Sequence, residues 1–341
     1  MPLLSITSHG LFCEKGGFFI DPWKPVDRAV VTHAHSDHAR PGSKHYLTSF
    51  SGKGILHERV GEKASIEGVP FGRKLDLNGV TVSLHPAGHL LGSSQVRVEH
   101  RGEVWVFTGD YKTQPDPSCE AFELVPCHTF ITESTFGLPI YQWQDSEVLF
   151  REINSWWRSN QAIGRTSVLF AYAVGKAQRV LAGVNASIGH ILVHGSVDRF
   201  LPHYREAAMP VAATQYATAE LAKEHRGQCL LIAPSSVQGT TWLKRFQPCS
   251  LAFASGWMTV RGNRRRQALD RGFALSDHVD WPSLMATIQA TGAERIGVTH
   301  GFADVVVRYL KEQGRDAWVL KTEFEGETDK IEKADGGEAS A

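Results

Sequence analysis

Four side chains that can bind metal ions lie within six residues, because the run from His33 to His38 reads His-Ala-His-Ser-Asp-His. His33 and His35 are two residues apart, so on an extended strand end both side chains point the same way. Asp37 and His38 follow and can turn toward a second point. Neutral imidazole and carboxylate are the ligands expected for zinc, or for manganese where oxygen ligands dominate. The run therefore indicates a metal site.

Further residues of ligand type follow next to glycines. His89 lies in the segment Ala-Gly-His-Leu-Leu-Gly, Asp110 ends the segment Thr-Gly-Asp, and His300 lies in Val-Thr-His-Gly. Neighbouring glycines permit tight turns and a close approach of the backbone. Each of the three alone is most often a turn residue, but the first cluster needs additional ligands to complete two coordination spheres.

Apolar strands are expected to position these residues. Residues 29–32, 104–107 and 129–132 are apolar runs that lead to His33, Asp110 and Glu133. Residues 295–299 lead in the same way to His300. Alternation of apolar and polar residues over 80–84 and 95–99 predicts half-buried antiparallel strands.

The pattern changes near residue 145. Leu149, Ile153 and Trp156 have helical spacing, with Asp145 or Ser146 as the N-cap. Strands expected at 167–172 and 191–193 alternate with helices, which favours βαβ units and a parallel sheet between 146 and 274. A helix at 281–291, a helix at 304–312 and a strand at 318–321 are expected after it.

Composition sets limits on the class of protein. The 341 residues carry no net charge, and no apolar run is long enough for a membrane span. The N-terminus lacks the pattern of a signal peptide. The five cysteines are scattered and form no Cys-x-x-Cys pair, which favours a reducing compartment. We therefore expect a soluble cytoplasmic protein without a membrane partner, and a local basic groove would suffice for nucleic acid.

These motifs together resemble the metallo-β-lactamase superfamily and its nucleic-acid-cutting β-CASP branch. The resemblance rests on Asp21 after an apolar strand, the run from His33 to His38, His89, Asp110, Glu133 in Glu-Ser-Thr-Phe-Gly, His278 in Ser-Asp-His-Val-Asp, and His300. It implies an α/β fold in which residues 1–145 and 275–322 form a metallo-β-lactamase αββα sandwich. The β-CASP α/β lid domain would be inserted at 146–274, and 323–341 would form a disordered tail.

The resemblance also implies two divalent metal ions, zinc or manganese. The first would be held by His33, His35 and His89. The second would be held by three further residues, Asp37, His38 and His300. Asp110 would bridge both ions.

Other residues would support these ligands or act on the substrate. Asp21 would orient a ligand histidine through its free ring nitrogen, and Glu133 would support a ligand or its loop. Catalysis is expected from Asp37 and Asp110 with the metals, and from His278 as the general acid. Either Asp277 or Asp280 is expected to orient His278.

Basic and hydroxyl side chains are candidates for substrate binding. Lys176 and Arg179 begin an expected helix in 146–274, and Arg261 and Arg264 open the strongest basic run of the chain. These residues are expected to meet backbone phosphates, although a solvated charged loop explains the run equally well. Ser134 is a further candidate for a terminal phosphate.

The resemblance is strongest to bacterial ligase-associated DNA exonucleases. It implies a 5′→3′ exonuclease on single-stranded DNA that leaves 5′-phosphate and 3′-hydroxyl ends. The enzyme would act in DNA repair with an ATP-dependent DNA ligase and a helicase. An RNA-processing β-CASP ribonuclease is the main alternative, because RNA-cutting members usually carry histidine at the position of His300. A small-molecule metallo-hydrolase and a non-catalytic partner subunit are more remote alternatives.

Overall fold

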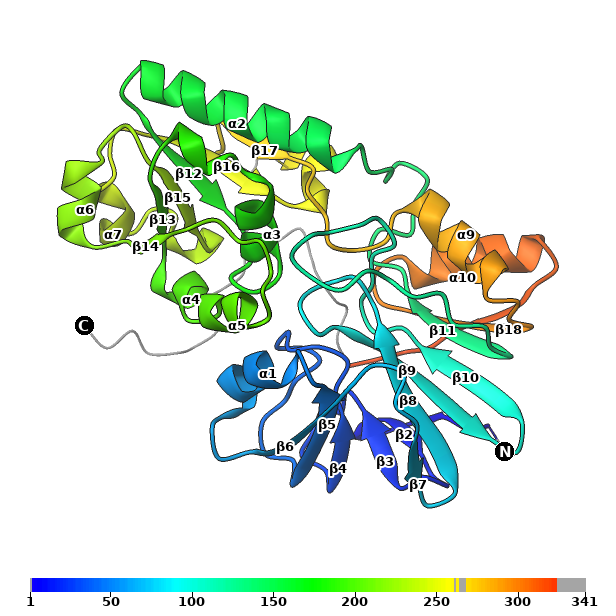
Figure 1. Ribbon diagram of the computed structural model, residues 1–341. Helices are drawn as coiled ribbons and strands as arrows, with labels where there is room; N and C mark the ends of the chain where they lie inside the picture. The colour runs from blue at the N-terminus through cyan, green and yellow to red at the C-terminus, as the bar shows by residue number, and fades with distance from the viewer. Residues whose placement is uncertain (1, 261, 264–267, 324–341) are drawn as a thin grey trace. The chain divides into compact units, whose positions relative to one another are not determined.

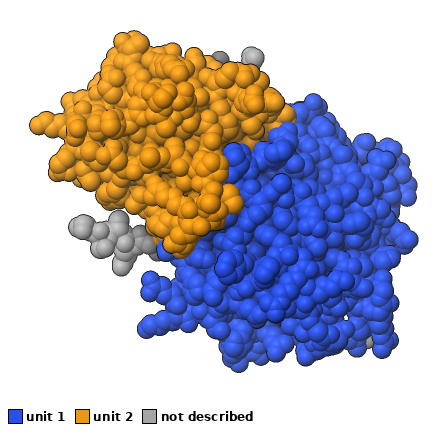
Figure 2. Space-filling view, viewed as in Figure 1, with its two compact units in different colours: residues 1–142, 277–327 blue, residues 143–276, 328–341 orange. Residues whose placement is uncertain are grey.

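The computed structural model describes all residues except 1, 261, 264–267 and 324–341, and its described residues form two compact units. Unit 1 comprises residues 1–142 and 277–327, and unit 2 contains residues 143–276, as Figure 2 colours them. Each unit has its own sheets and its own core. The predicted boundaries after residues 145 and 274 lie within three residues of these limits. The assignment of the parts to a metallo-β-lactamase domain and a β-CASP lid stays a prediction, and the expected tail falls almost entirely outside the described residues.

The first sheet of unit 1 has six strands in sequence order, β1 to β6. The first three strands pair antiparallel and the last three continue in parallel. The strands are β1 Ser5–Thr7, β2 Gly10–Cys13, β3 Phe18–Ile20, β4 Arg28–Val30, β5 His45–Ser49 and β6 Ser65–Val69.

The second sheet has seven strands in the order β19-β18-β11-β10-β9-β8-β7. Strands β7 to β10 pair antiparallel, which confirms the alternating pattern at 80–84 and 95–99. Strands β10, β11, β18 and β19 pair in parallel. The strands are β7 Leu75–Leu77, β8 Val80–Pro86, β9 Ser94–His100, β10 Glu103–Phe107, β11 Thr129–Glu133, β18 Arg295–Thr299 and β19 Asp316–Val319.

The two sheets of unit 1 share an apolar core, and helices lie outside them. Side chains of β2, β3 and β4 form one buried cluster with side chains of β8, β9 and β10. Helices α9 (Trp281–Ala290) and α10 (Ala303–Glu312) cover the other face of the second sheet (Figure 1). Helix α1 (Lys53–Val60) packs beside β6 of the first sheet.

The parallel part of the second sheet brings polar strand ends to one edge. Strand β10 ends three residues before Asp110, β11 ends at Glu133, and β18 ends directly before His300. Because parallel neighbours run in the same direction, their carboxyl ends meet at the same edge of the sheet. Strand β4 of the first sheet leads to His33 in the same way. The predicted strands with polar ends are therefore confirmed.

Unit 2 is built on a six-stranded sheet in the order β14-β13-β15-β12-β16-β17, in which every pair is parallel. This confirms the parallel sheet expected from alternating strands and helices. The strands are β12 Thr166–Phe170, β13 Ile191–Val193, β14 Gln215–Tyr216, β15 Leu230–Ala233, β16 Cys249–Ala254 and β17 Arg271–Phe273. The helices include α2 Ser146–Ala162, α3 Lys176–Gly183, α4 Gly195–Asp198, α5 Leu201–Glu206, α6 Ala219–Glu224 and α7 Thr241–Lys244, with 3₁₀ turns at Ala186–Ile188, Ser235–Val237 and Gly256–Thr259.

Helix α2 begins and packs largely as predicted. Asp145 is the N-cap, and its side chain accepts a hydrogen bond from the Glu147 amide at 2.6 Å. Leu149 and Ile153 are buried against α3, but Trp157 is the fully buried tryptophan and Trp156 is only partly buried. A spacing of four residues keeps successive side chains on one face of a helix, which favours Trp157 after Ile153.

None of the helices among the described residues is long and apolar enough to cross a membrane. All five cysteines lie in the described part of the chain, and each is buried without a disulfide partner.

We predict that the native cysteines resist alkylation. Burial raises the pKa of Cys127 to about 12 and that of Cys229 to about 11, so both thiols stay protonated and shielded at neutral pH. Mass spectrometry after a short iodoacetamide pulse at pH 7.5 should find these two residues unmodified, whereas all five should react in denaturant. Rapid modification of native Cys127 or Cys229 would contradict the packing of the strand edges that bury them.

Candidate metal centre

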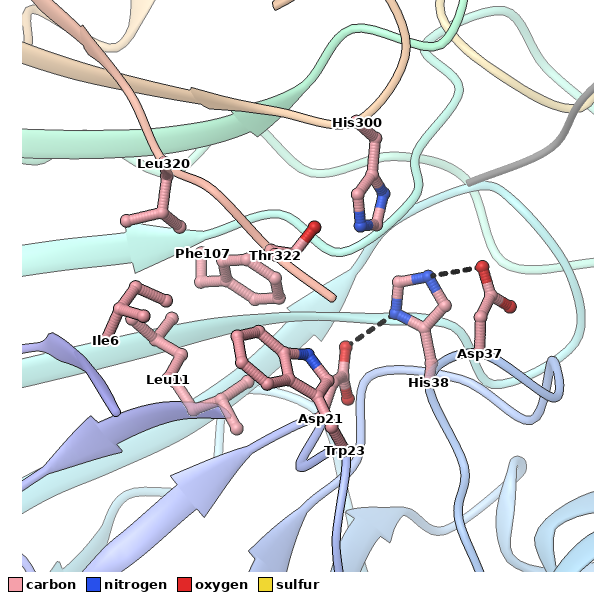
Figure 3. A pocket seen from close by; sticks show the side chains of 11 residues that line it. Ile6, Leu11, Asp21, Trp23, Asp37, His38, Phe107, His300, Leu320 and Thr322 are labelled. Atoms are coloured by element: carbon pink, nitrogen blue, oxygen red, sulfur yellow. Dashed lines mark hydrogen bonds and ion pairs between the residues drawn. The ribbon is translucent and has the colours of Figure 1, made fainter. Parts of the chain in front are cut away.

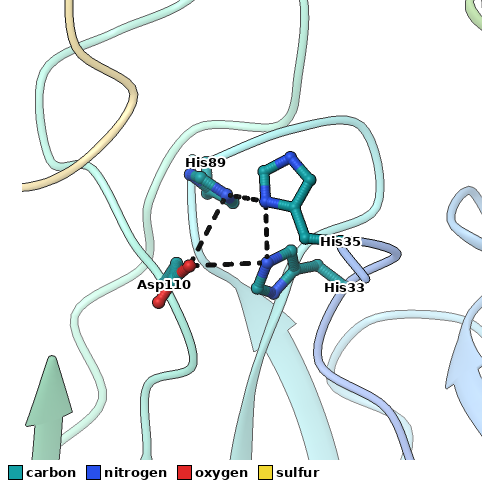
Figure 4. Close-up of side chains that lie close together, drawn as sticks. All are labelled: His33, His35, His89 and Asp110. Carbon is teal, nitrogen blue, oxygen red and sulfur yellow. Dashed lines mark hydrogen bonds and ion pairs between the residues drawn. The ribbon is translucent and has the colours of Figure 1, made fainter. Parts of the chain in front are cut away.

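Three histidines and Asp110 converge on one point at the edge of the sheets (Figure 4). His35 Nδ1 lies 3.2 Å from His33 Nε2 and 3.1 Å from His89 Nε2. Asp110 Oδ2 lies 3.5 Å from His33 Nε2 and 4.0 Å from His89 Nε2. The structure thus brings together the three histidines expected for the first metal and the expected bridging carboxylate.

A second group shares Asp110. His38 Nε2 lies 3.4 Å from Asp110 Oδ2 and 3.6 Å from Asp37 Oδ2. His300 Nδ1 lies 3.5 Å from the other carboxylate oxygen, Asp110 Oδ1. Figure 3 shows His38 between Asp21 and Asp37, with His300 pointing toward the same region. The other six predicted ligand residues therefore lie around Asp110, and the roles of all seven as ligands stay a prediction.

The spacing and chemistry of these atoms fit metal ions. Ligand atoms 2.0–2.1 Å from a tetrahedral zinc would lie ~3.3 Å apart, close to the separations around His35. Three imidazole nitrogens facing one another repel unless a proton or cation lies between them. Among the described residues, His38 Nε2, Asp110 Oδ1 and His300 Nδ1 are buried atoms without a hydrogen-bond partner. Buried polar atoms are rarely left unsatisfied, so these groups could hold metal ions.

Buried carboxylate and carbonyl groups fix the orientation of the histidines. Asp21 Oδ2 accepts from His38 Nδ1 at 2.7 Å, which leaves Nε2 facing Asp110. Thr32 holds Asp21 in turn, because its amide donates to Oδ1 at 2.8 Å and its hydroxyl to Oδ2 at 2.6 Å. The carbonyl of Asp277 lies 2.9 Å from His89 Nδ1. Second partners of this kind select the tautomer of a ligand histidine.

The electrostatics of the site separate neutral from charged groups. Burial lowers the pKa of His33 well below its ordinary value and also lowers the pKa of His89. Both rings are therefore neutral and can offer a nitrogen lone pair to a metal ion. Burial opposes ionisation of Asp110, yet the charge of His38 outweighs it and holds the carboxyl pKa well below its usual range. For His38, burial opposes the charged form, but the nearby carboxylates, Asp110 first among them, raise its pKa well above the ordinary value. A bound cation would take the place of that proton.

A buried carboxylate–histidine pair lies directly beside the candidate ligands. His278 Nδ1 lies 3.0 and 2.9 Å from the two oxygens of Glu133, and both side chains are almost fully buried. Glu133 Oε1 also accepts from the Tyr111 amide at 2.8 Å, directly after Asp110. The ring of His278 lies 4.8 Å from that of His89. Glu133 therefore supports both the loop of Asp110 and the orientation of His278.

The group that holds His278 Nδ1 differs from the two aspartates expected from the sequence. Glu133, and not Asp277 or Asp280, holds its Nδ1. The Asp280 side chain instead caps helix α9 by accepting from the Ser283 amide. Asp277 contributes its backbone carbonyl to His89, and its Oδ1 lies 3.8 Å from His278 Nε2. Sequence reasoning also missed Thr32, although its position directly before His33 was a signal.

Ser134 supports the loop of His300. Its hydroxyl donates to the His300 carbonyl at 2.5 Å and to the Thr299 carbonyl at 3.2 Å. His300 has a positive φ of 57°, and a Cβ on Gly301 would lie 2.5 Å from the Ser134 carbonyl oxygen. This close approach explains the glycine after His300. Because its hydroxyl is engaged here, binding of a terminal phosphate by Ser134 has no support in these contacts.

The predicted phosphate contacts of unit 2 gain no support either. Lys176 and Arg179 are both buried in α3. The Arg179 guanidinium donates to the Ser276 carbonyl and to Ser146 Oγ at 3.1 Å, so it ties α2 and α3 to the end of the inserted segment. Arg261 and Arg264 lie outside the described residues. A role of these four residues in substrate binding stays a prediction.

An apolar crevice opens beside the second group (Figure 3). Asp37, His38 and His300 line one part of it. Its remaining walls are mostly apolar and come from both sheets of unit 1: Ile6, Leu11, Ile20, Trp23, Phe107 and Leu320.

Known proteins resemble parts or all of the chain. No protein-family model matches it. It is 30% identical over 316 residues to a probable DNA ligase of Opitutus terrae, which covers 92% of this chain and 30% of that protein. It is 30% identical over 161 residues to the endoribonuclease YSH1 of Eremothecium gossypii, covering 47% of this chain and 20% of that protein. It is also 30% identical over 162 residues to cleavage and polyadenylation specificity factor 73 of Drosophila melanogaster, covering 45% and 23%.

The chain spans less than a third of the length of these curated relatives. A crystal structure of an Enterococcus faecalis V583 protein of unknown function matches with a TM-score of 0.58 at 12% identity, covering 87% of this chain and 79% of that one. That similarity shows a shared fold alone. The sequence similarities support the resemblance to the metallo-β-lactamase superfamily and its β-CASP nucleases, and leave the bacterial subtype open.

We predict that Asp21→Asn weakens metal binding. The asparagine side chain has one acceptor oxygen, whereas the Thr32 amide, the Thr32 hydroxyl and His38 Nδ1 all donate to the carboxylate of Asp21. His38 therefore loses its fixed orientation. Loss of such a supporting partner lowers metal affinity by roughly 10–100-fold. Zinc and manganese content after dialysis, measured by mass spectrometry, checks this. Asp27→Asn is the control, because Asp27 is 77% exposed. Equal affinity in Asp21→Asn and the wild type would contradict the orienting role.

Proposed function

We propose that the chain is a two-metal DNA nuclease, a 5′→3′ exonuclease on single-stranded DNA that leaves 5′-phosphate and 3′-hydroxyl ends. The observation that carries this proposal is the pair of ligand groups sharing Asp110, with the buried Glu133–His278 pair beside them. Two divalent ions suit phosphodiester hydrolysis. The placement of a buried imidazole at their edge adds a group that can move a proton.

The seven ligand residues would hold zinc or manganese in two positions. His33, His35 and His89 would hold one ion. Asp37, His38 and His300 would hold the other, and Asp110 would contact both. When bound, such ions lower the pKa of water and neutralise charge on the attacking and leaving oxygens of a phosphodiester. Because the donor set contains both nitrogen and oxygen atoms, it accepts either metal.

The chain's own residues would manage the proton on the leaving group. Glu133 holds His278 Nδ1, so only Nε2 remains to face a substrate. A carboxylate on Nδ1 stabilises the imidazolium form and fixes the ring. From Nε2, the imidazolium can donate a proton to the departing O3′. Asp277 directly precedes His278, and its carbonyl holds His89 Nδ1. His89 therefore stays in place during this step.

The choice of DNA rests on how much of the chain each relative matches. The protein named as a probable DNA ligase matches 92% of the chain, whereas the endoribonuclease and the cleavage factor match 47% and 45%. The same similarity supports action in DNA repair beside an ATP-dependent DNA ligase, with a helicase as a further partner by family resemblance. RNA cleavage is the second candidate, favoured by those two relatives and by the histidine at position 300.

Substrates labelled at either end test the proposal. Single-stranded DNA and RNA of one sequence should be incubated with zinc or manganese, and with EDTA as the metal-free control. We expect mononucleotides to be released from the 5′ end of DNA only when metal is present. Cleavage of RNA but not DNA would overturn the DNA assignment, and release from the 3′ end would overturn the polarity. Less than one metal per chain and no cleavage would favour a non-catalytic subunit.

We predict that His278→Asn keeps both metals but loses most turnover. Asparagine can still donate to Glu133 but cannot supply a proton, and general acid catalysis contributes roughly 10²–10⁴-fold to a rate. Metal content and kcat on labelled DNA should be measured together. His45→Asn is the matched control, because His45 is an exposed histidine at the start of β5. If His278→Asn instead loses metal, the general-acid role is wrong and His278 is a ligand.

A further inference from the structure

Phe50 is the most exposed large apolar side chain among the described residues, with 71% of its surface accessible. It follows β5 directly. Single exposed apolar residues are common on protein surfaces and alone carry no meaning. The backbone beneath this ring, however, is held firmly. The Phe50 amide donates to the Val69 carbonyl at 2.8 Å, and a Cβ on Gly68 would lie 3.2 Å from Phe50 Cα.

The residues on either side of Phe50 are bonded to the loop of the metal ligand His89. Ser49 Oγ donates to the Gly92 carbonyl at 2.5 Å and accepts from the Gly52 amide at 3.0 Å. A Cβ on Gly92 would lie only 2.1 Å from the Gly52 nitrogen, so the two backbones touch.

One carboxylate ties the same two loops together. Glu120 accepts from the Gly92 amide at 2.9 Å through one oxygen and from Ser51 Oγ through the other. The turn that carries Phe50 is therefore fixed relative to His89.

Residues 49–60 also contact the run from His33 to His38. In helix α1, Arg59 Nε donates to the Ala34 carbonyl at 3.1 Å, between His33 and His35. Residues 49–60 thus connect both ligand-bearing loops of the first metal position. Lys53, one turn after Phe50, adds a positive charge that suits a phosphate backbone.

We propose that Phe50 is a stacking platform for a nucleobase of single-stranded nucleic acid bound at the metal centre. This inference rests on the proposed nuclease function. Every nucleobase has an aromatic face, so stacking on a phenyl ring is tolerant of sequence. An exonuclease must accept each base in turn, and a rigid neutral ring meets that requirement where hydrogen bonds to base edges would not. The hydrogen bonds of Ser49, Glu120 and Arg59 would keep the stacked base at a constant position relative to the ligands.

The test compares two oligonucleotides that differ only in their bases. One is single-stranded DNA, and the other has the same length but carries abasic sites throughout. In Phe50→Ala, KM for the base-bearing strand should rise roughly 10-fold, a loss typical of one stacked base, while kcat changes less than about twofold. KM for the abasic strand should stay unchanged. Phe50→Tyr and Phe50→Trp should restore the wild-type KM, because both keep an aromatic face.

Ile163→Ala is the control for loss of an exposed apolar side chain, because Ile163 is 66% exposed in unit 2. It should leave both KM values unchanged. An unchanged KM in Phe50→Ala would overturn the proposal, and so would an equal rise for both strands, which indicates a role in holding the loop.

Binding separates this inference from the proposed function. Fluorescence anisotropy of labelled DNA with the full chain in EDTA requires no cleavage. If wild-type protein cuts neither strand, the nuclease proposal fails, but weaker binding of the base-bearing strand by Phe50→Ala still supports the platform. If wild-type protein binds base-bearing and abasic strands equally, the platform is overturned even when DNA is cut.

Discussion

The buried carboxylate of Asp110 is the group on which the rest of the site depends. It is 4% exposed and lies within 3.5 Å of a nitrogen of His33, His38 and His300. Burying a carboxylate without compensation costs several kcal/mol. Positive charge must therefore gather around it, supplied by protonated His38 or by cations. This requirement explains why one aspartate lies between two groups of histidines from three separate segments.

The fold meets that requirement through strand direction. Parallel strands β10, β11 and β18 deliver Asp110, Glu133 and His300 to one edge of the second sheet. The facing sheet contributes the run from His33 through the end of β4. The core between the sheets is apolar, so the polar groups at the edge cannot move inward without losing their partners. Packing of the two sheets therefore fixes the positions of the candidate ligands.

Sequence alone predicted the features that local patterns encode. Apolar runs ending in Asp110, Glu133 and His300 indicated both the strands and the edge where they meet. The gathering of the candidate ligands was implied by the family resemblance, whereas the distant partners that orient them could not be predicted from local patterns. Glu133 and His278 are 145 residues apart, and His89 and Asp277 are 188 apart, so their pairing depends on how the strands are ordered in the sheet. The phosphate contact expected of Arg179 rested on its charge and on a family pattern, whereas its burial and its bond to Ser276 depend on the packing of α3.

Two carboxylate–histidine pairs in unit 1 share one arrangement. Asp21 holds His38 Nδ1 and Glu133 holds His278 Nδ1, so each ring presents Nε2. His38 Nε2 faces the Asp110 and Asp37 carboxylates at 3.4 and 3.6 Å, a setting that favours a bound cation. His278 Nε2 lies 3.8 Å from Asp277 Oδ1. Under the proposed function, the surroundings of Nε2, rather than the pair itself, would separate a ligand histidine from a proton donor.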